Sequence, residues 1–228
     1  QAPTYHGEKA FTSGPVYVGA IICFLFVLGL LIVKGPYKWA LLIATLFSIT
    51  LAWGHNMMWF TELFFNYFPM YNKFRAVESI LVVAEITIPL LAILALQTIV
   101  DRKIEWKELQ KNMFIAGGIT AGLSLFFALF GGIVDITSSY DSQWTSQVPA
   151  WLKDAILEQR TAMIKADAWR SFIFIALGFA IVYWYAWQTQ KAQQPKHNYI
   201  LYGALTVLVL ADMVPVNKRF FGDNHFVR

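Results

Sequence analysis

The fold class is decided by the run AVESILVVAEITIPLLAILALQTI, residues 76–99. Its only charged residues are Glu78 and Glu85, and roughly 20 apolar residues in a helix cross the hydrocarbon core of a bilayer. Outside this run the chain has the same character, since 57% of the 228 residues are hydrophobic and 14% are charged, against about 25% charged in soluble domains. The sequence therefore predicts an all-α fold, a polytopic membrane helical bundle.

Six apolar runs are expected to be transmembrane helices, over about 15–33, 37–53, 76–99, 113–134, 169–188 and 198–214. The second of these is the shortest. We expect residues 1–228 to form a single transmembrane domain, and both ends have the composition of loops. Because the chain opens on Gln-Ala-Pro-Thr without an initiating Met, we expect it to be a fragment of a longer chain.

Basic residues in short loops predict the orientation, because such loops are retained in the cytoplasm. Three short loops carry Lys34, Lys38, Arg102, Lys103, Lys107, Lys111, Lys191 and Lys196. The two longer segments, 54–75 and 135–168, and both termini then lie on the outer side. We expect the functional face to be extracytoplasmic.

The outer segment 54–75 is rich in aromatic residues and also carries charge. Lys73 and Arg75 stand beside Tyr71 and other aromatic residues, at the expected membrane surface. Arg binds phosphate through two hydrogen bonds and Lys as a point charge, so these residues are candidates for binding a lipid phosphate. The alternative is an ordinary interfacial anchor with cations that reach to the surface.

Three further residues of this region are candidate binding residues. His55 and Glu62 are seven positions apart, so on a helix they share a face and could exchange a proton. Two such groups are too few to predict a metal site, and a hydrogen-bonded interfacial histidine is the alternative. Glu78 follows Arg75 by one helical turn, where its interaction with the helix dipole would explain it equally well.

Polar residues inside the apolar runs are uncommon and therefore informative. Glu85 must face the bundle interior, have a partner or be protonated, and Pro89 follows it by one turn. It is either a structural residue or part of a proton relay. Asp212 lies near the outer end of the last run, where a local ion pair explains it as well as a site would. Glycines of the fourth run indicate close helix packing.

The segment 147–168, within the outer segment 135–168, has the pattern of an amphipathic helix. Apolar residues near one face include Leu152, Ile156 and Met163, and charged residues occupy the rest. We favour a separate helix that lies on the outer leaflet. The alternative is an extension of the fifth run, since no helix breaker separates Asp167 from Trp169.

Four stretches of the chain resemble the YfhO family of bacterial membrane proteins, in its Bacteroidetes form. They are Tyr5–Tyr17 (YHGEKAFTSGPVY), Tyr67–Ala76 (YFPMYNKFRA), Asp167–Arg170 (DAWR) and Val216–Phe220 (VNKRF). The resemblance extends over nearly all of the chain, which would correspond to a central-to-late part of the family's membrane domain. It implies a bacterial inner (cytoplasmic) membrane protein.

YfhO proteins are similar to the GT-C class of glycosyltransferases, which move a sugar from a polyprenyl-phosphate donor to an extracytoplasmic acceptor. The resemblance implies a catalytic carboxylate in a first outer loop, which would precede this chain, and it leaves a divalent metal open. Lys73 and Arg75 would bind the lipid phosphate, and Tyr5, Thr12 and Ser13 would contact the sugar or shape its pocket. The implied partners are membrane lipid and a polyprenyl-phosphate-linked sugar.

Two other function classes remain open from the sequence. Glu85, Pro89 and the glycine-rich fourth run would suit a transporter or lipid flippase, although such proteins usually show internal repeats and none is visible here. A non-catalytic structural subunit is the third reading. The net charge of +4 is spread along the chain, without the basic cluster that tracks nucleic acid, so no nucleic-acid partner is expected.

Overall fold

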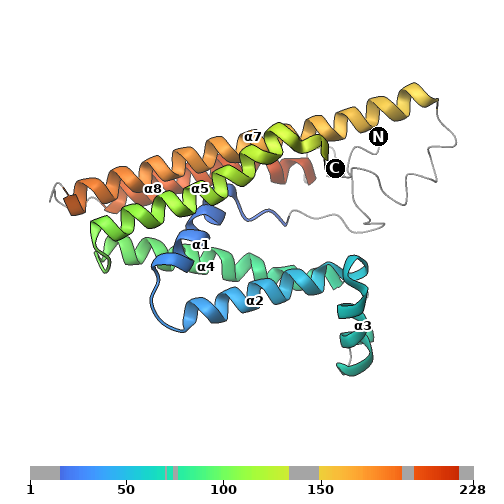
Figure 1. The fold of residues 1–228 in the computed structure, drawn as a ribbon, viewed down its shortest axis with the longest axis horizontal. Helices are drawn as coiled ribbons and strands as arrows, with labels where there is room; N and C mark the ends of the chain where they lie inside the picture. Colours follow the sequence, from blue (N-terminus) through green and yellow to red (C-terminus); the bar gives the residue numbers. More distant parts are fainter. Residues whose placement is uncertain (1–15, 70, 74–76, 134–148, 192–197, 221–228) are drawn as a thin grey trace, which may run out of the picture.

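The computed structural model describes residues 16–69, 71–73, 77–133, 149–191 and 198–220, and it is a bundle of helices (Figure 1). In chain order the elements are α1 (Ala20–Ile32), α2 (Tyr37–Ala52), η1 (Gly54–Met57), α3 (Met58–Tyr67), η2 (Tyr71–Lys73), η3 (Val77–Ile80), α4 (Leu81–Val100), α5 (Trp106–Phe130), η4 (Gly131–Ile133), α7 (Ala150–Ala186), η5 (Trp187–Lys191) and α8 (Asn198–Phe220). All regular structure in these residues is helical, which confirms the predicted all-α fold.

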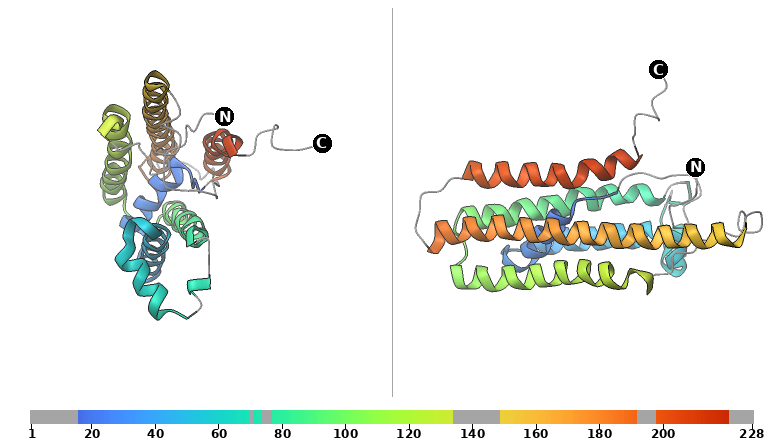
Figure 2. Two further views of the ribbon diagram at one scale, coloured as in Figure 1. Left: turned by 90° about the vertical axis from the view of Figure 1, so that its right-hand side faces the viewer. Right: turned by 90° about the horizontal axis from the view of Figure 1, so that it is seen from above.

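Helix α1 is the centre of the bundle. It contacts α2, α4, α5, α7 and α8, and Figure 2 shows it crossing obliquely between longer helices. Ile21, Phe24 and Leu28 have no exposed surface, and the main apolar core is built around them. A helix that is apolar all round is stable where protein or lipid surrounds it, and α1 is surrounded by other helices of the protein.

The number of long apolar helices differs from the six expected spans. Four helices are long and apolar enough to cross a membrane: Glu78–Val100, Trp106–Ile133, Ala150–Lys191 and Asn198–Lys218. Helices α1 and α2 have 13 and 16 residues, or about 20 and 24 Å against a hydrocarbon core of about 30 Å. The expected first run was too long because Gly19, with φ of 95°, interrupts it.

The favoured reading of segment 147–168 as a separate surface helix is wrong. Helix α7 runs without interruption from Ala150 to Ala186, so this segment is the first half of the fifth apolar helix. Ile156 and Arg160 are buried, which ties the first half to the rest of the protein. In Figure 1 the yellow end of α7 extends beyond α5.

The basic loops share one end of the bundle, as predicted. The junction of α1 with α2, the junction of α4 with α5 and the end of α7 lie together, on the left in Figure 1. Lys34, Lys103, Lys107 and Lys191 belong to these junctions. We refer to this as the basic end. Its assignment to the cytoplasm stays a prediction.

The first part of segment 54–75 turns away from the bundle at the opposite end. Helix α3 runs across the direction of α2 and α4 (Figure 1). Aromatic contacts hold the bend between α2 and α3, which we call the α3 elbow. The ring centroid of Phe47 of α2 lies 6.3 Å from that of Phe60 and 5.5 Å from that of Phe64. The Thr61 hydroxyl donates a hydrogen bond to the Gly54 carbonyl at 2.8 Å. No residue of α3 is buried.

Glycines set how closely α1 packs against its neighbours. A Cβ at Gly29 would lie 2.8 Å from the Leu91 carbonyl oxygen of α4, and one at Gly178 of α7 would lie 2.9 Å from Ile21. The expected close packing of the fourth run holds at Gly117, where a Cβ would lie 3.0 Å from Phe179. It does not hold at Gly118, which has open space beside it.

Gly29→Ala is expected to lower the free energy of unfolding by about 1–3 kcal/mol, because the added methyl group meets backbone that cannot move aside. Gly118→Ala is the matched control. It should be neutral or stabilising by up to about 1 kcal/mol, because alanine has the higher helix propensity. Thermal unfolding of both variants in detergent micelles measures the difference, and equal melting temperatures would contradict the close α1–α4 packing.

Candidate functional site

Asp212 is a wholly buried carboxylate in the apolar helix α8. The Tyr17 hydroxyl lies 2.9 Å from each of its two oxygens. The backbone N–H of Ala20, the first residue of α1, donates to its Oδ2 at 2.8 Å. Negative charge is favoured at a helix N-terminus, so Asp212 acts as the N-cap of α1 from a distant position in the chain.

Backbone geometry at Gly19 makes this contact available. Gly19 has a φ of 95°, in the region where a side chain is strained, and it precedes Ala20 directly. A Cβ there would lie 3.6 Å from Asp212 Oδ2. The positive φ turns the chain sharply into α1, and the first N–H groups of the helix then point toward α8.

Arg170 of α7 is the cation of this site. Its Nε lies 3.6 Å from Asp212 Oδ1, and its Nη1 lies 3.6 Å from Asp167 Oδ1, one turn earlier on the same helix. The guanidinium carbon is 5.4 Å from the centroid of the Tyr17 ring, a distance at which cation and ring attract. Nε is buried and makes no hydrogen bond to the residues that the structure describes.

A pocket of about 400 Å³ opens beside these residues, between α5, α7 and α8. Its polar lining consists of Tyr17, Ser124, Asp167, Arg170 and Ser171. Its apolar lining consists of Leu123, Phe127, Ile164, Ala168 and Val216. A mostly apolar pocket with a few convergent polar groups is the usual form of a small-molecule site.

The charges of the pocket favour a neutral polar ligand over an anion. Two carboxylates, Asp167 and Asp212, face the one guanidinium of Arg170. The group is therefore not a free cationic site for phosphate. Carboxylate oxygens accept hydrogen bonds and guanidinium nitrogens donate them, so the wall suits a ligand with several hydroxyl groups.

None of the binding residues predicted from sequence lines this pocket within the described part of the chain. Lys73, in η2, and Glu62, on α3, are exposed, and Glu78, in η3, is half-buried. Tyr71 packs against Phe64 at 5.9 Å between ring centroids. The predicted residues for which the structure gives no side-chain position are Tyr5, Thr12, Ser13 and Arg75, outside the described residues, and His55, whose backbone alone is described.

Burial distinguishes Tyr71 among these predicted residues. Its hydroxyl is buried and has no hydrogen-bond partner in the described part of the chain, and burial raises its pKa. Lys73, two residues later, is exposed and so accessible to a lipid phosphate. The roles predicted for both residues stay predictions.

Sequence reasoning missed the grouping of Tyr17, Asp167, Arg170 and Asp212. Two signals were present, since Arg170 is a cation inside the expected fifth span and Asp212 is a carboxylate inside the sixth. Such residues have partners when they lie in a membrane. Glu85, by contrast, is half-buried on α4, with no hydrogen bond or ion pair to the described residues.

No group of three or more His, Cys, Asp or Glu side chains that could hold a metal ion occurs in the described residues. Glu62 therefore belongs to no such group among the side chains that the structure describes. The sequence left open whether a divalent metal binds, and the described residues offer no candidate metal centre.

Asp212→Asn is expected to lower the free energy of unfolding by about 3 kcal/mol, because it removes the buried one of the two counter-charges of Arg170 and leaves only the more exposed Asp167. The double variant Asp212→Asn/Arg170→Met should lose less than the two single variants together. Thermal denaturation in detergent, monitored by tryptophan fluorescence, gives the unfolding free energies of the wild type, the two single variants and the double variant for a double-mutant cycle. Strict additivity would mean that the two side chains are not coupled.

Comparisons with known proteins do not indicate a family or a function for this chain. No family model matches the chain, and no curated protein or solved structure matches it significantly. The function of the chain is therefore inferred from the Asp212 group, the pocket beside it and the four stretches of sequence that resemble the YfhO family.

Proposed function

We propose that the chain is part of a membrane-embedded, GT-C-like glycosyltransferase, which transfers a sugar from a polyprenyl-phosphate donor to an extracytoplasmic acceptor. In this proposal the pocket between α5, α7 and α8 holds the sugar of the donor. The observation that carries it is an apolar pocket with one wall built from Asp167, Arg170 and Tyr17.

The lining of the pocket supports a sugar ligand. Asp167 and Arg170 would accept hydrogen bonds from sugar hydroxyl groups and donate to them. Tyr17 and Phe127 supply aromatic surface for the C–H face of a sugar ring. The remaining lining, such as Leu123 and Ile164, is apolar.

The place of the resembling stretches gives independent support. Tyr17 ends the first stretch, Asp167–Arg170 is the third and Val216 begins the fourth. All three contribute to the lining of the same pocket, although they are far apart in the sequence. Sequence features shared with a family of enzymes are expected to gather where a ligand binds.

Roles within the proposed site follow from the charges. Asp167 is paired with Arg170, so we assign it to holding sugar hydroxyl groups and not to deprotonating the acceptor. The catalytic carboxylate stays an expectation for a loop outside this sequence. Lys73 does not line this pocket. Because the donor's phosphate is bonded directly to its sugar, binding of a lipid phosphate by Lys73 and Arg75 stays a separate prediction, which the pocket does not support.

Asp167→Asn is expected to lower transfer of sugar from a polyprenyl-phosphate donor at least tenfold, mainly by raising the KM for the donor. The matched control is Asp154→Asn, an exposed carboxylate on the same helix outside the pocket, which should keep wild-type transfer. Radiolabelled sugar transfer by membranes that contain the full-length protein measures both. Equal transfer by the two variants would remove the pocket from the proposal.

A transporter or lipid flippase is the second candidate, and Glu85 is the observation that favours it. This carboxylate lies in the apolar helix α4, one turn before Pro89, without a partner among the described residues. If it carries a proton during transport, Glu85→Gln should abolish proton-coupled uptake into vesicles and leave glycosyl transfer unchanged. Full uptake by this variant would exclude the role.

A further inference from the structure

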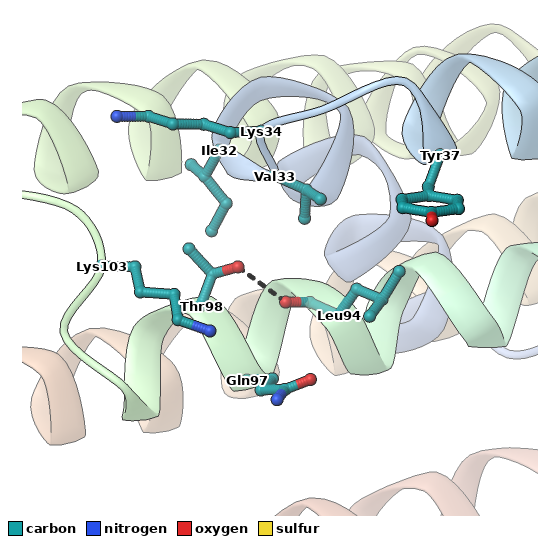
Figure 3. Close-up of a pocket in the computed structure, with 8 residues that line it drawn as sticks. All are labelled: Ile32, Val33, Lys34, Tyr37, Leu94, Gln97, Thr98 and Lys103. Atoms are coloured by element: carbon teal, nitrogen blue, oxygen red, sulfur yellow. Dashed lines mark hydrogen bonds between the residues drawn. The ribbon is translucent and has the colours of Figure 1, made fainter.

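A second pocket lies at the basic end of the bundle, on the far side of the protein from the α3 elbow. It has a volume of about 230 Å³ and is formed where α1 ends, α2 begins and α4 runs into α5. Figure 3 shows both lysines at its rim: the Lys103 side chain is turned toward Thr98 and Gln97, and the Lys34 side chain extends outward from the first junction. The side chains between them come from α1 and α4.

The charged groups around this pocket are predominantly cationic. Lys34 is exposed and has no partner in the described part of the chain. Lys103 lies 2.9 Å from Asp101, but both side chains are exposed, so the pair is weak and Lys103 can turn to another anion. Lys38 is not available, because its Nζ donates to the Leu30 carbonyl at 3.0 Å.

The neutral polar groups of the pocket are mainly free donors. Tyr37 is 75% exposed and contributes a hydroxyl group, and Gln97 contributes an amide (Figure 3). Thr98 differs, because its hydroxyl donates to the Leu94 carbonyl at 2.8 Å. Each of these groups can donate to an anion, and the exposed Lys34 side chain would have to turn inward to do so together with the others.

Apolar surface continues from the pocket along the helices. Ile32 and Val33 are buried at its base. On α4, Leu90 and Ile93 are 43% and 60% exposed on the surface that leads away from the basic end. An anion that used this surface as well as the donors would need hydrocarbon chains.

We propose that this pocket binds the phosphate head group of an anionic membrane lipid, with its acyl chains along α4. Lys34 and Lys103 would contact the phosphate, and Tyr37 and Gln97 the neighbouring oxygens. Basic pockets between transmembrane helices are known to bind such head groups. The inference depends on the chain lying in a membrane and not on glycosyl transfer.

The test compares two double variants that each remove two positive charges from the same end. Lys34→Gln/Lys103→Gln alters the pocket, and Lys107→Gln/Lys111→Gln alters exposed lysines outside it. All four side chains are exposed, so both proteins should fold, and equal melting temperatures in detergent check this. Phosphatidylglycerol, titrated into the purified protein, is the probe, and native mass spectrometry reports the bound lipid.

We expect the wild type to bind phosphatidylglycerol at least five times more tightly than phosphatidylcholine. The pocket variant should lose that preference, and the control variant should keep it within twofold. Equal losses in both variants would overturn the proposal, because they indicate diffuse attraction to positive charge. Full displacement of the lipid by millimolar inorganic phosphate would also overturn it, since the acyl chains would then contribute nothing.

Discussion

The fold depends on the carboxylate of Asp212 at the N-terminus of α1. One buried group joins three parts of the chain, since it accepts from the first N–H of α1 and from Tyr17 and lies beside Arg170 of α7. Removing a carboxylate from water is costly unless hydrogen bonds and an opposite charge replace the solvent. Here a backbone donor, a hydroxyl group and a guanidinium do so together. The position of α8 therefore follows from where α1 begins.

The central position of α1 governs the other contacts. Because Gly29 allows α4 to approach and Gly178 allows α7 to approach, a helix of 13 residues has long neighbours on several sides. The same short helix separates two sites. The Asp212 group and its sugar-sized pocket lie at its beginning, and the lysine-lined pocket lies at its end.

Hydropathy predicted the helical class and the approximate places of the apolar helices, because burial in lipid selects apolar residues whatever their partners. It predicted the bounds of α2 but not the start of α1, since a positive φ at Gly19 leaves no trace in hydropathy. It also misassigned residues 150–168, because an amphipathic pattern is the same for a surface helix and for a helix that leaves the membrane. Arg170 and Asp212 could be recognised singly as charged residues inside apolar runs. Their contact depends on how α7 packs against α8, which a sequence pattern does not reveal. The predictions for Lys73 and Arg75 concern a different part of the protein and still await experiment.

Helix α7 has 37 residues, a length of about 56 Å, whereas the hydrocarbon core is about 30 Å thick. If it stands upright, about 25 Å of rigid rod remains outside the hydrocarbon. Ile156 and Arg160 in this half are buried, and α7 is continuous from there to Asp167 and Arg170. The pocket wall and the half of α7 that extends beyond the hydrocarbon therefore share one rigid support.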